Sequence, residues 1–132
     1  MKACRKGRCQ TEWHRVDLLV QTGAQNAVIE FKFYWDRPTL RLDGIPSHLK
    51  GGAGPKNFGE FQGCVRKLHR LRHDGIHRKY LVLVYARTST RKRRYSYALS
   101  YDGLKPKGWV KMAKTIRHSV ARQVACKLIE VV

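Results

Sequence analysis

Two neighbouring segments of the chain alternate between apolar and polar residues with the period of two that is typical of β-strands. In residues 27–35 every second position is apolar, from Ala27 to Trp35, while Glu30 and Lys32 occupy the other series. Residues 16–21 alternate in a similar way. A strand with one buried face produces this pattern, because successive side chains point to opposite sides of a sheet. Residues 16–35 are therefore predicted to form a β-hairpin with its apolar series buried.

The loop of this hairpin fixes which residues face each other. Gly23 and Ala24 suit a two-residue type II′ loop, which needs glycine at its first position and whose twist matches paired strands. Counting outward from this loop sets Asp17 directly opposite Glu30, with both side chains on the same face. Like charges at opposed positions destabilise a sheet. We therefore expect a compensating positive charge beside these two carboxylates.

A divalent cation is the natural compensation for the pair Asp17 and Glu30. Mg²⁺ prefers oxygen ligands, and it commonly takes one or two protein carboxylates together with water and substrate phosphate. Lys32 lies two positions beyond Glu30 and is expected to project beside this cation. There its ammonium group can orient or deprotonate an attacking water, or neutralise charge that develops on a phosphate.

An aspartate in one strand, a hairpin, and then Glu-x-Lys within the apolar segment Ile29–Phe33 resembles the PD-(D/E)XK nuclease superfamily. The resemblance covers residues 16–87, judged by element order as well as by residues. It implies a metal-dependent phosphodiesterase in which Asp17 and Glu30 hold Mg²⁺ or Mn²⁺, the carbonyl of Phe31 adds a ligand, and Lys32 assists the water.

The fold that this resemblance implies is α/β and restriction-endonuclease-like. We expect a central mixed β-sheet of about four or five strands flanked by helices. Only fifteen residues precede Val16, and the helix that usually opens this core is therefore expected to be shortened. Residues 1–132 are predicted to form a single nuclease domain.

The segment after the hairpin predicts a helix followed by a buried strand. Apolar residues recur every three or four positions in residues 57–73, where Asn57 can cap the helix and Gly75 can end it. Gln62 matches a glutamine that the resemblance implies near the active site, and a solvent-exposed helix residue is the alternative. The apolar run Tyr80–Ala86 predicts a strand buried on both faces, which completes a βαβ crossover.

Basic residues are concentrated after this strand. Residues 87–94 predict a cationic turn, residues 95–101 a strand, and residues 109–131 a C-terminal helix with separate apolar and basic stripes. Clustered Arg and Lys release counterions when they bind phosphate, although a solvated charged surface is the alternative. The predicted nucleic-acid contacts are Arg87, Arg91, Lys92, Arg93, Arg94, Lys111 and Lys114.

Two further segments lack the apolar content of a packed element. Residues 1–11 predict a basic arm, either flexible or in contact with phosphate. Residues 36–56 are rich in glycine and proline and predict a flexible loop, which is either a flap over substrate or a linker.

The charge of the chain points to a polyanionic partner. The formal net charge is +19, from 28 Lys and Arg against 9 Asp and Glu, while an apolar content of 42% is sufficient for folding. Such an excess is typical of proteins that bind nucleic acid. DNA is the leading candidate and RNA the second, and an acidic inhibitor or partner protein and a homodimer are further candidates.

Cysteine spacing and hydropathy exclude several other classes. The four cysteines are scattered without a CxxC pair, which argues against a compact zinc module or a disulfide scaffold. The basic N-terminus lacks the apolar run of a secretory signal, and no stretch approaches the length of a membrane span. A soluble, cytoplasmic protein without a membrane partner is expected.

The sequence thus predicts a Mg²⁺- or Mn²⁺-dependent endonuclease that hydrolyses phosphodiester bonds in DNA. The alternative is a degenerate, non-catalytic module that binds DNA or RNA, in which Asp17 and Glu30 pair with nearby cations. A structural protein associated with RNA is a third reading, and it predicts tight RNA binding without cleavage. All three bind phosphate, so the salt dependence of binding does not separate them.

Overall fold

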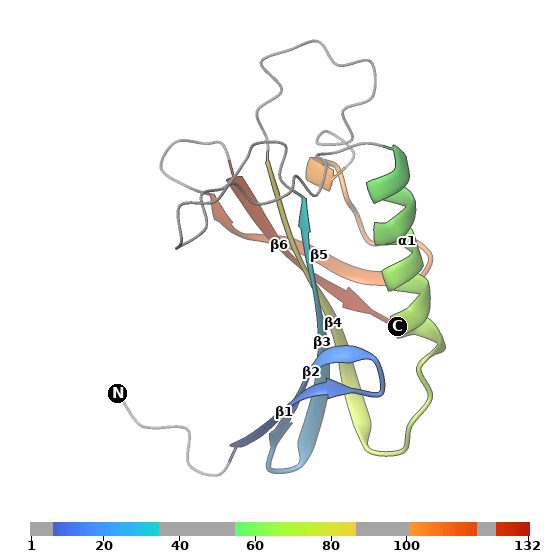
Figure 1. The fold of residues 1–132 in the computed structure, drawn as a ribbon, viewed down its shortest axis with the longest axis vertical. Helices are drawn as coiled ribbons and strands as arrows, with labels where there is room; N and C mark the ends of the chain where they lie inside the picture. Colours follow the sequence, from blue (N-terminus) through green and yellow to red (C-terminus); the bar gives the residue numbers. More distant parts are fainter. Residues whose placement is uncertain (1–6, 35–54, 87–100, 119–123) are drawn as a thin grey trace, which may run out of the picture.

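A six-stranded mixed sheet with one helix against one face makes up the part of the chain that the computed structural model describes, residues 7–34, 55–86, 101–118 and 124–132 (Figure 1). The predicted α/β class is confirmed. The expectation of several flanking helices is wrong for these residues. In chain order the elements are β1 (Gly7–Trp13), β2 (Val16–Thr22), β3 (Gln25–Tyr34), α1 (Pro55–Arg70), β4 (Ile76–Ala86), β5 (Val110–His118) and β6 (Val124–Val131), and the strand order is β1-β2-β3-β4-β6-β5.

The predicted hairpin is formed by β2 and β3. Thr22 faces Gln25 across the two-residue loop, and the Thr22 hydroxyl donates to the Gln25 carbonyl at 2.9 Å. Gly23 has a φ of 55°, a conformation that glycine adopts without steric cost. The register that the loop predicts is therefore confirmed as far as its last pair, Leu18 and Ile29.

The two faces of β3 are reversed relative to the prediction. Val28, Glu30 and Tyr34 are buried on the side covered by α1, whereas Phe31 and Phe33 are 49% and 48% exposed. The expected burial of the apolar series is wrong, because alternation distinguishes two faces without saying which one receives a helix. The apolar stripe of α1 packs on the face of Val28.

The predicted β-α-β crossover is present, with β3 and β4 as parallel neighbours. Helix α1 begins at Pro55, two residues before Asn57, the residue predicted to cap it. Proline is favoured in the first turn because its missing N–H would have no partner there. The helix ends at Arg70, and Gly75, with a φ of 89°, lies in the turn before β4. Only one face of β4 is fully buried, so the predicted burial of both faces is wrong.

The predicted helix over residues 109–131 is wrong, because this segment forms the strands β5 and β6. Ala125, Lys127, Ile129 and Val131 are buried at every second position, which is strand periodicity. β6 pairs with β4 on one side and with β5 on the other. These long-range partners outweigh the helical spacing of the apolar residues, and the many β-branched residues favour the strands.

Strand β1 includes residues 7–11, which were expected to belong to a basic arm, and it pairs with β2. The element before β2 is thus a strand and not the shortened helix that the resemblance implies. Trp13 packs partly buried against the core.

The predicted loop over residues 36–56 lies outside the described residues except for its last two, which begin α1. The predicted strand over residues 95–101 also lies outside them, except that Tyr101 sits in a short helical turn.

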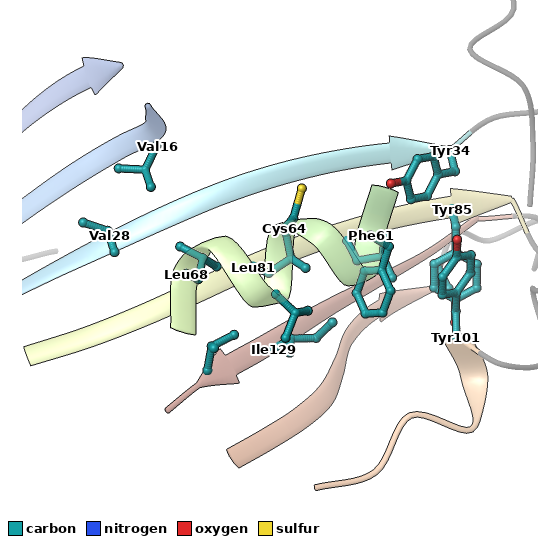
Figure 2. Close-up of a cluster of buried hydrophobic side chains, with 14 of the residues drawn as sticks. Val16, Val28, Tyr34, Phe61, Cys64, Leu68, Leu81, Tyr85, Tyr101 and Ile129 are labelled. Atoms are coloured by element: carbon teal, nitrogen blue, oxygen red, sulfur yellow. The ribbon is translucent and has the colours of Figure 1, made fainter. Parts of the chain in front are cut away.

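The core lies between α1 and the sheet. Figure 2 shows Leu68 of the helix beside Leu81 and Ile129 of the sheet, all three fully buried. At the other end of the cluster the rings of Tyr85 and Tyr101 lie with their centroids 5.1 Å apart. This core holds the helix-facing side of β3, and with it Glu30, in a fixed position.

Candidate functional site

Glu30 is a carboxylate buried between β3 and α1, with 3% of the residue exposed. Its Oε1 atom lies 2.7 Å from the Nζ of Lys67 and 3.6 Å from the Nζ of Lys32. The thiol of Cys64 also donates to Oε1, at 4.0 Å. Burying an ionised carboxylate is costly unless it is paired. The ammonium groups of the two lysines provide that pairing on one of the two carboxylate oxygens.

The second oxygen of Glu30, Oε2, is buried and has no hydrogen-bond partner among the described residues. Leaving such an atom unsatisfied costs about 1–3 kcal/mol or more for a charged group. Buried polar atoms of this kind are uncommon, and they call for a bound ion, a water or a catalytic role. The unpaired Oε2 atom of Glu30 is therefore the strongest indication of a functional site among the described residues.

Asp17 lies next to Glu30 but in a different environment. The paired ladder of β2 and β3 ends at Leu18 and Ile29, one position before Asp17 would face Glu30. Beyond that point the Asp17 Oδ2 accepts a hydrogen bond from the backbone N–H of Phe31 at 2.7 Å. The Asp17 carboxylate is therefore held against the residue that follows Glu30, and Asp17 is exposed whereas Glu30 is buried.

Lys32 lies on the same face of β3 as Glu30, as predicted. Its Nζ is 3.6 Å from Glu30 and 3.5 Å from the exposed Glu60 of α1. Burial lowers the pKa of Lys32, but electrostatic interactions with Cys64, Glu30 and Glu60 and a hydrogen bond to Glu60 together outweigh burial and raise that pKa above its usual value. Burial raises the pKa of the Cys64 thiol.

Lys67 and Cys64 belong to this cluster but were not assigned to it from the sequence. Besides its contact with Glu30, Lys67 donates to the backbone carbonyl of Arg15 at 2.8 Å, which ties the turn before β2 to α1. A signal was present in the spacing, because Glu60, Cys64 and Lys67 follow one another at four and three residues. Residues at that spacing share one side of a helix.

The oxygen donors present fit a hard divalent cation. Glu30 offers a bare buried oxygen, and Asp17 is held beside it on the neighbouring strand. Mg²⁺ needs only one or two carboxylates, because water and phosphate complete its coordination. In the described ranges no group of three or more His, Cys, Asp or Glu residues is arranged so that it could hold a metal ion, so the donors do not resemble a site that the protein closes by itself.

The structure does not bring Gln62 to this cluster. Gln62 is exposed, and it lies two residues from Cys64, which corresponds to about 200° around a helix.

Lys111 and Lys114 lie on β5 and not on a helix; both are exposed, and Lys111 pairs with Glu130 at 3.2 Å. The remaining predicted nucleic-acid contacts, Arg87, Arg91, Lys92, Arg93 and Arg94, fall outside the described residues.

A basic hollow adjoins the cluster on α1. It has a volume of about 470 Å³ and is lined by Gly63, Arg66, Lys67, Arg70 and Leu71. Three of these five residues carry a positive charge, and Lys67 is also the closest partner of Glu30. The hollow therefore offers an anion a place within reach of the buried carboxylate.

A comparison with protein-family models, with curated proteins and with solved structures found no match to this chain. None of the described helices is both long enough and apolar enough to cross a membrane.

Proposed function

We propose that this protein is a phosphodiesterase that cleaves DNA with the help of Mg²⁺ or Mn²⁺, and that Glu30 is the centre of its site. The observation that carries the proposal is the bare Oε2 of Glu30, buried beside the strand of Asp17. A net charge of +19 supports a polyanionic substrate. The pairing of Glu30 with Lys32 at 3.6 Å agrees with the Glu-x-Lys pattern in the sequence.

The basic hollow supplies the binding part of this proposal. Arg66 and Arg70 lie one helical turn apart and would hold phosphate oxygens of the DNA backbone. Lys67 lies between this hollow and Glu30. A phosphate in the hollow would therefore compete for the Lys67 ammonium and leave Glu30 with more negative charge for a cation.

Each side chain of the cluster has a separate task. Glu30 and Asp17 would hold the cation together with the Phe31 carbonyl. When bound, such a cation polarises the phosphoryl oxygen and lowers the pKa of a bound water. Lys32, fixed between Glu30 and Glu60, would orient the water or neutralise charge on the phosphate. Cys64 would keep bulk water away from the inner side of Glu30.

Cleavage of supercoiled plasmid DNA tests this proposal directly. We expect wild-type protein to nick or linearise the plasmid with Mg²⁺ or Mn²⁺ and to be inactive in EDTA. Glu30→Gln keeps the shape of the side chain but removes its charge, and Lys32→Met removes the ammonium group. Each is expected to lower the cleavage rate by about 100-fold or more, because Glu30 would hold the cation and Lys32 would act on the water or the phosphate.

Asp74→Asn is the matched control, because it removes an exposed carboxylate in the turn before β4 and leaves the cluster intact. Its cleavage rate should equal that of the wild type. Titration with Mn²⁺ in a calorimeter gives a readout that does not depend on activity. Equal Mn²⁺ affinity in wild type and in Glu30→Gln would refute the assignment of Glu30.

A second candidate function is a non-catalytic module that binds nucleic acid. The observation that favours it is the ion pair of Glu30 with Lys67 at 2.7 Å, which neutralises the carboxylate without any metal. This function predicts that wild-type protein retains DNA in a gel-shift assay but never cleaves it, with Mg²⁺, Mn²⁺ or neither. It also predicts no detectable Mn²⁺ binding.

A further inference from the structure

Lys67 belongs both to the basic hollow of α1 and to the cluster around Glu30. Its Nζ atom lies 2.7 Å from the Oε1 of Glu30 and donates to the Arg15 carbonyl at 2.8 Å. The same side chain lines the hollow together with Arg66 and Arg70. A ligand in the hollow and a cation on Glu30 would therefore both act on one ammonium group.

This ammonium group opposes the binding of a cation to Glu30. The Oε2 atom of Glu30 has no partner among the described residues, while Lys67 occupies the other oxygen of the same carboxylate. Lys32 lies on that oxygen too, at 3.6 Å, so two positive charges already face a single negative charge. Like charges repel each other more strongly where little water screens them. A divalent cation therefore binds Glu30 weakly as long as both ammonium groups stay beside it.

Of the two lysines, Lys67 is the one that an incoming anion can draw away. Lys32 does not line the hollow, and it is also paired with Glu60 at 3.5 Å. The Lys67 side chain is 37% exposed, and the flexible stem of a lysine lets its ammonium group move between neighbouring acceptors. An ammonium group has three N–H donors, and Lys67 uses two of them on Glu30 and Arg15. A phosphate can take the third donor first and then replace Glu30.

The other side chains of the hollow suit a phosphate group. Arg66 and Arg70 are both exposed, and neither forms an ion pair or a hydrogen bond with another described residue. Guanidinium groups bind phosphate oxygens through paired N–H donors. The volume of about 470 Å³ lies in the range of small-ligand sites, and Leu71 adds an apolar wall for the rest of a nucleotide.

We propose that a nucleic-acid phosphate in the hollow draws Lys67 away from Glu30 and thereby admits the cation, whereas Lys67 keeps the free protein poor in metal. The proposal rests on the metal site proposed at Glu30 and adds its regulation, because substrate and cation then bind cooperatively. Coupling between two binding sites is reciprocal, so the cation also raises the affinity of the hollow for phosphate by the same factor.

Calorimetric titration with Mn²⁺, with thymidine monophosphate as the probe of the hollow, tests this coupling. The nucleotide has a phosphate group but no phosphodiester bond to cleave, and thymidine is the matched ligand without the phosphate. We expect the nucleotide to raise the Mn²⁺ affinity of the wild type by about fivefold or more, in the range of common allosteric couplings. Thymidine should leave the affinity unchanged. Titration of Mn²⁺ into the nucleotide alone corrects for binding in solution.

Three variants locate the coupling. Lys67→Met removes the ammonium group, so it should bind Mn²⁺ about fivefold or more tightly than the wild type without any nucleotide, and the nucleotide should add less than about twofold. Arg66→Gln/Arg70→Gln removes the phosphate contacts, so it should keep the wild-type Mn²⁺ affinity and lose the response to the nucleotide. Lys114→Met makes the same substitution at an exposed lysine of β5 and should behave as the wild type. All titrations are run at about 0.15 M NaCl, where charges farther apart than about 8 Å are screened.

The proposal is overturned if the nucleotide leaves the Mn²⁺ affinity of the wild type unchanged, or if folded Lys67→Met binds Mn²⁺ as weakly as the wild type does. Circular dichroism verifies folding. If Lys67→Met does not fold, the double arginine variant decides, because a response to the nucleotide as large as that of the wild type overturns the proposal. Failure of the proposed function gives a different result, namely equal Mn²⁺ affinity in wild type and Glu30→Gln both with and without the nucleotide.

Discussion

Two buried tyrosines on neighbouring strands differ in how their hydroxyl groups are satisfied. The Tyr85 hydroxyl donates to the carboxylate of Asp102. The Tyr34 hydroxyl is buried and has no hydrogen-bond partner among the described residues. Burial also raises the pKa of Tyr34, so this phenol stays neutral in any ordinary buffer. One hydroxyl therefore contributes to stability, whereas the other only carries the cost of its desolvation.

Replacing each tyrosine by phenylalanine should have opposite effects on the free energy of unfolding. Tyr34→Phe is expected to raise it by about 1 kcal/mol, because an unsatisfied buried group is removed. Tyr85→Phe is expected to lower it by about 1–3 kcal/mol, because a hydrogen bond to a charged group is lost. Urea denaturation of both variants measures the difference. A loss of stability in Tyr34→Phe equal to that in Tyr85→Phe would show that the Tyr34 hydroxyl has a partner.

At the scale of residues, the sequence predicts contacts within one hairpin better than contacts between elements that are distant in the sequence. Lys32 and Glu30 are two apart on a strand, and alternation alone places them on one face. Lys67 reaches Glu30 from a helix that follows a long connection. Its position depends on how the helix packs against the sheet, which a local pattern does not specify.

Among the elements, helix α1 contains two glycines at positions where neither the backbone conformation nor a neighbouring atom requires glycine. Gly59 and Gly63 lie inside the helix, and a Cβ at either position would meet no atom within 4 Å. Gly75 differs, because it ends the connection to β4 with a φ of 89° and a Cβ there would lie 3.7 Å from the Asn26 side chain. Of these three glycines, Gly75 alone uses a backbone conformation that other residues rarely adopt.

Alanine at these positions should separate the two cases. Gly59→Ala is expected to stabilise the protein by about 0.5–1 kcal/mol, because alanine restricts the unfolded chain and favours a helix. Gly75→Ala is expected to destabilise it by about 1–2 kcal/mol, because the left-handed conformation is strained for a residue with a Cβ. Thermal melts followed at 222 nm compare the two. If Gly75→Ala stabilised the protein instead, the turn would not require the positive φ at this position.

The elements also show why the hairpin β2–β3 and its register were predicted correctly and the conformation of β6 was not. The hairpin β2–β3 contains its own loop signal and its own alternation, and its partners are adjacent in sequence. The pattern of β6 is ambiguous, because Val124, Leu128 and Val131 also satisfy helical spacing. Its strand conformation follows from pairing with β4, whose residues lie between 38 (Ala86 with Val124) and 52 (Lys79 with Val131) positions earlier in the chain.

At the scale of the whole molecule, the excess of positive charge produces long-range electrostatic repulsion within the chain. There are 28 Lys and Arg against 9 Asp and Glu in a chain of 132 residues. Such self-repulsion destabilises the compact state while it favours encounter with a polyanion. The Debye length falls from about 30 Å at 0.01 M salt to about 8 Å at 0.15 M, so added salt screens most of this repulsion.

We therefore expect the melting temperature to rise as NaCl increases from 0.01 to 0.15 M, opposite to the fall in DNA affinity over the same range. The rise should be about 4 °C for each kcal/mol of repulsion removed. Differential scanning calorimetry measures it, and Na₂SO₄ at equal ionic strength separates general screening from effects of the anion. A melting temperature that is flat or falls with NaCl would show that the charges are already compensated within the fold.

The two outer strands, β1 and β5, have a consequence for how the protein behaves at high concentration. β5 has two irregularities in its register. In β1, Glu12 next to the last residue has a φ of 52°, and His14 and Arg15 after the strand have φ values of 45° and 65°. Such kinks twist an edge strand and interrupt its row of free N–H and C=O groups. Neither border of the sheet is therefore a straight template on which another chain could add a strand, and this geometry disfavours growth into fibrils.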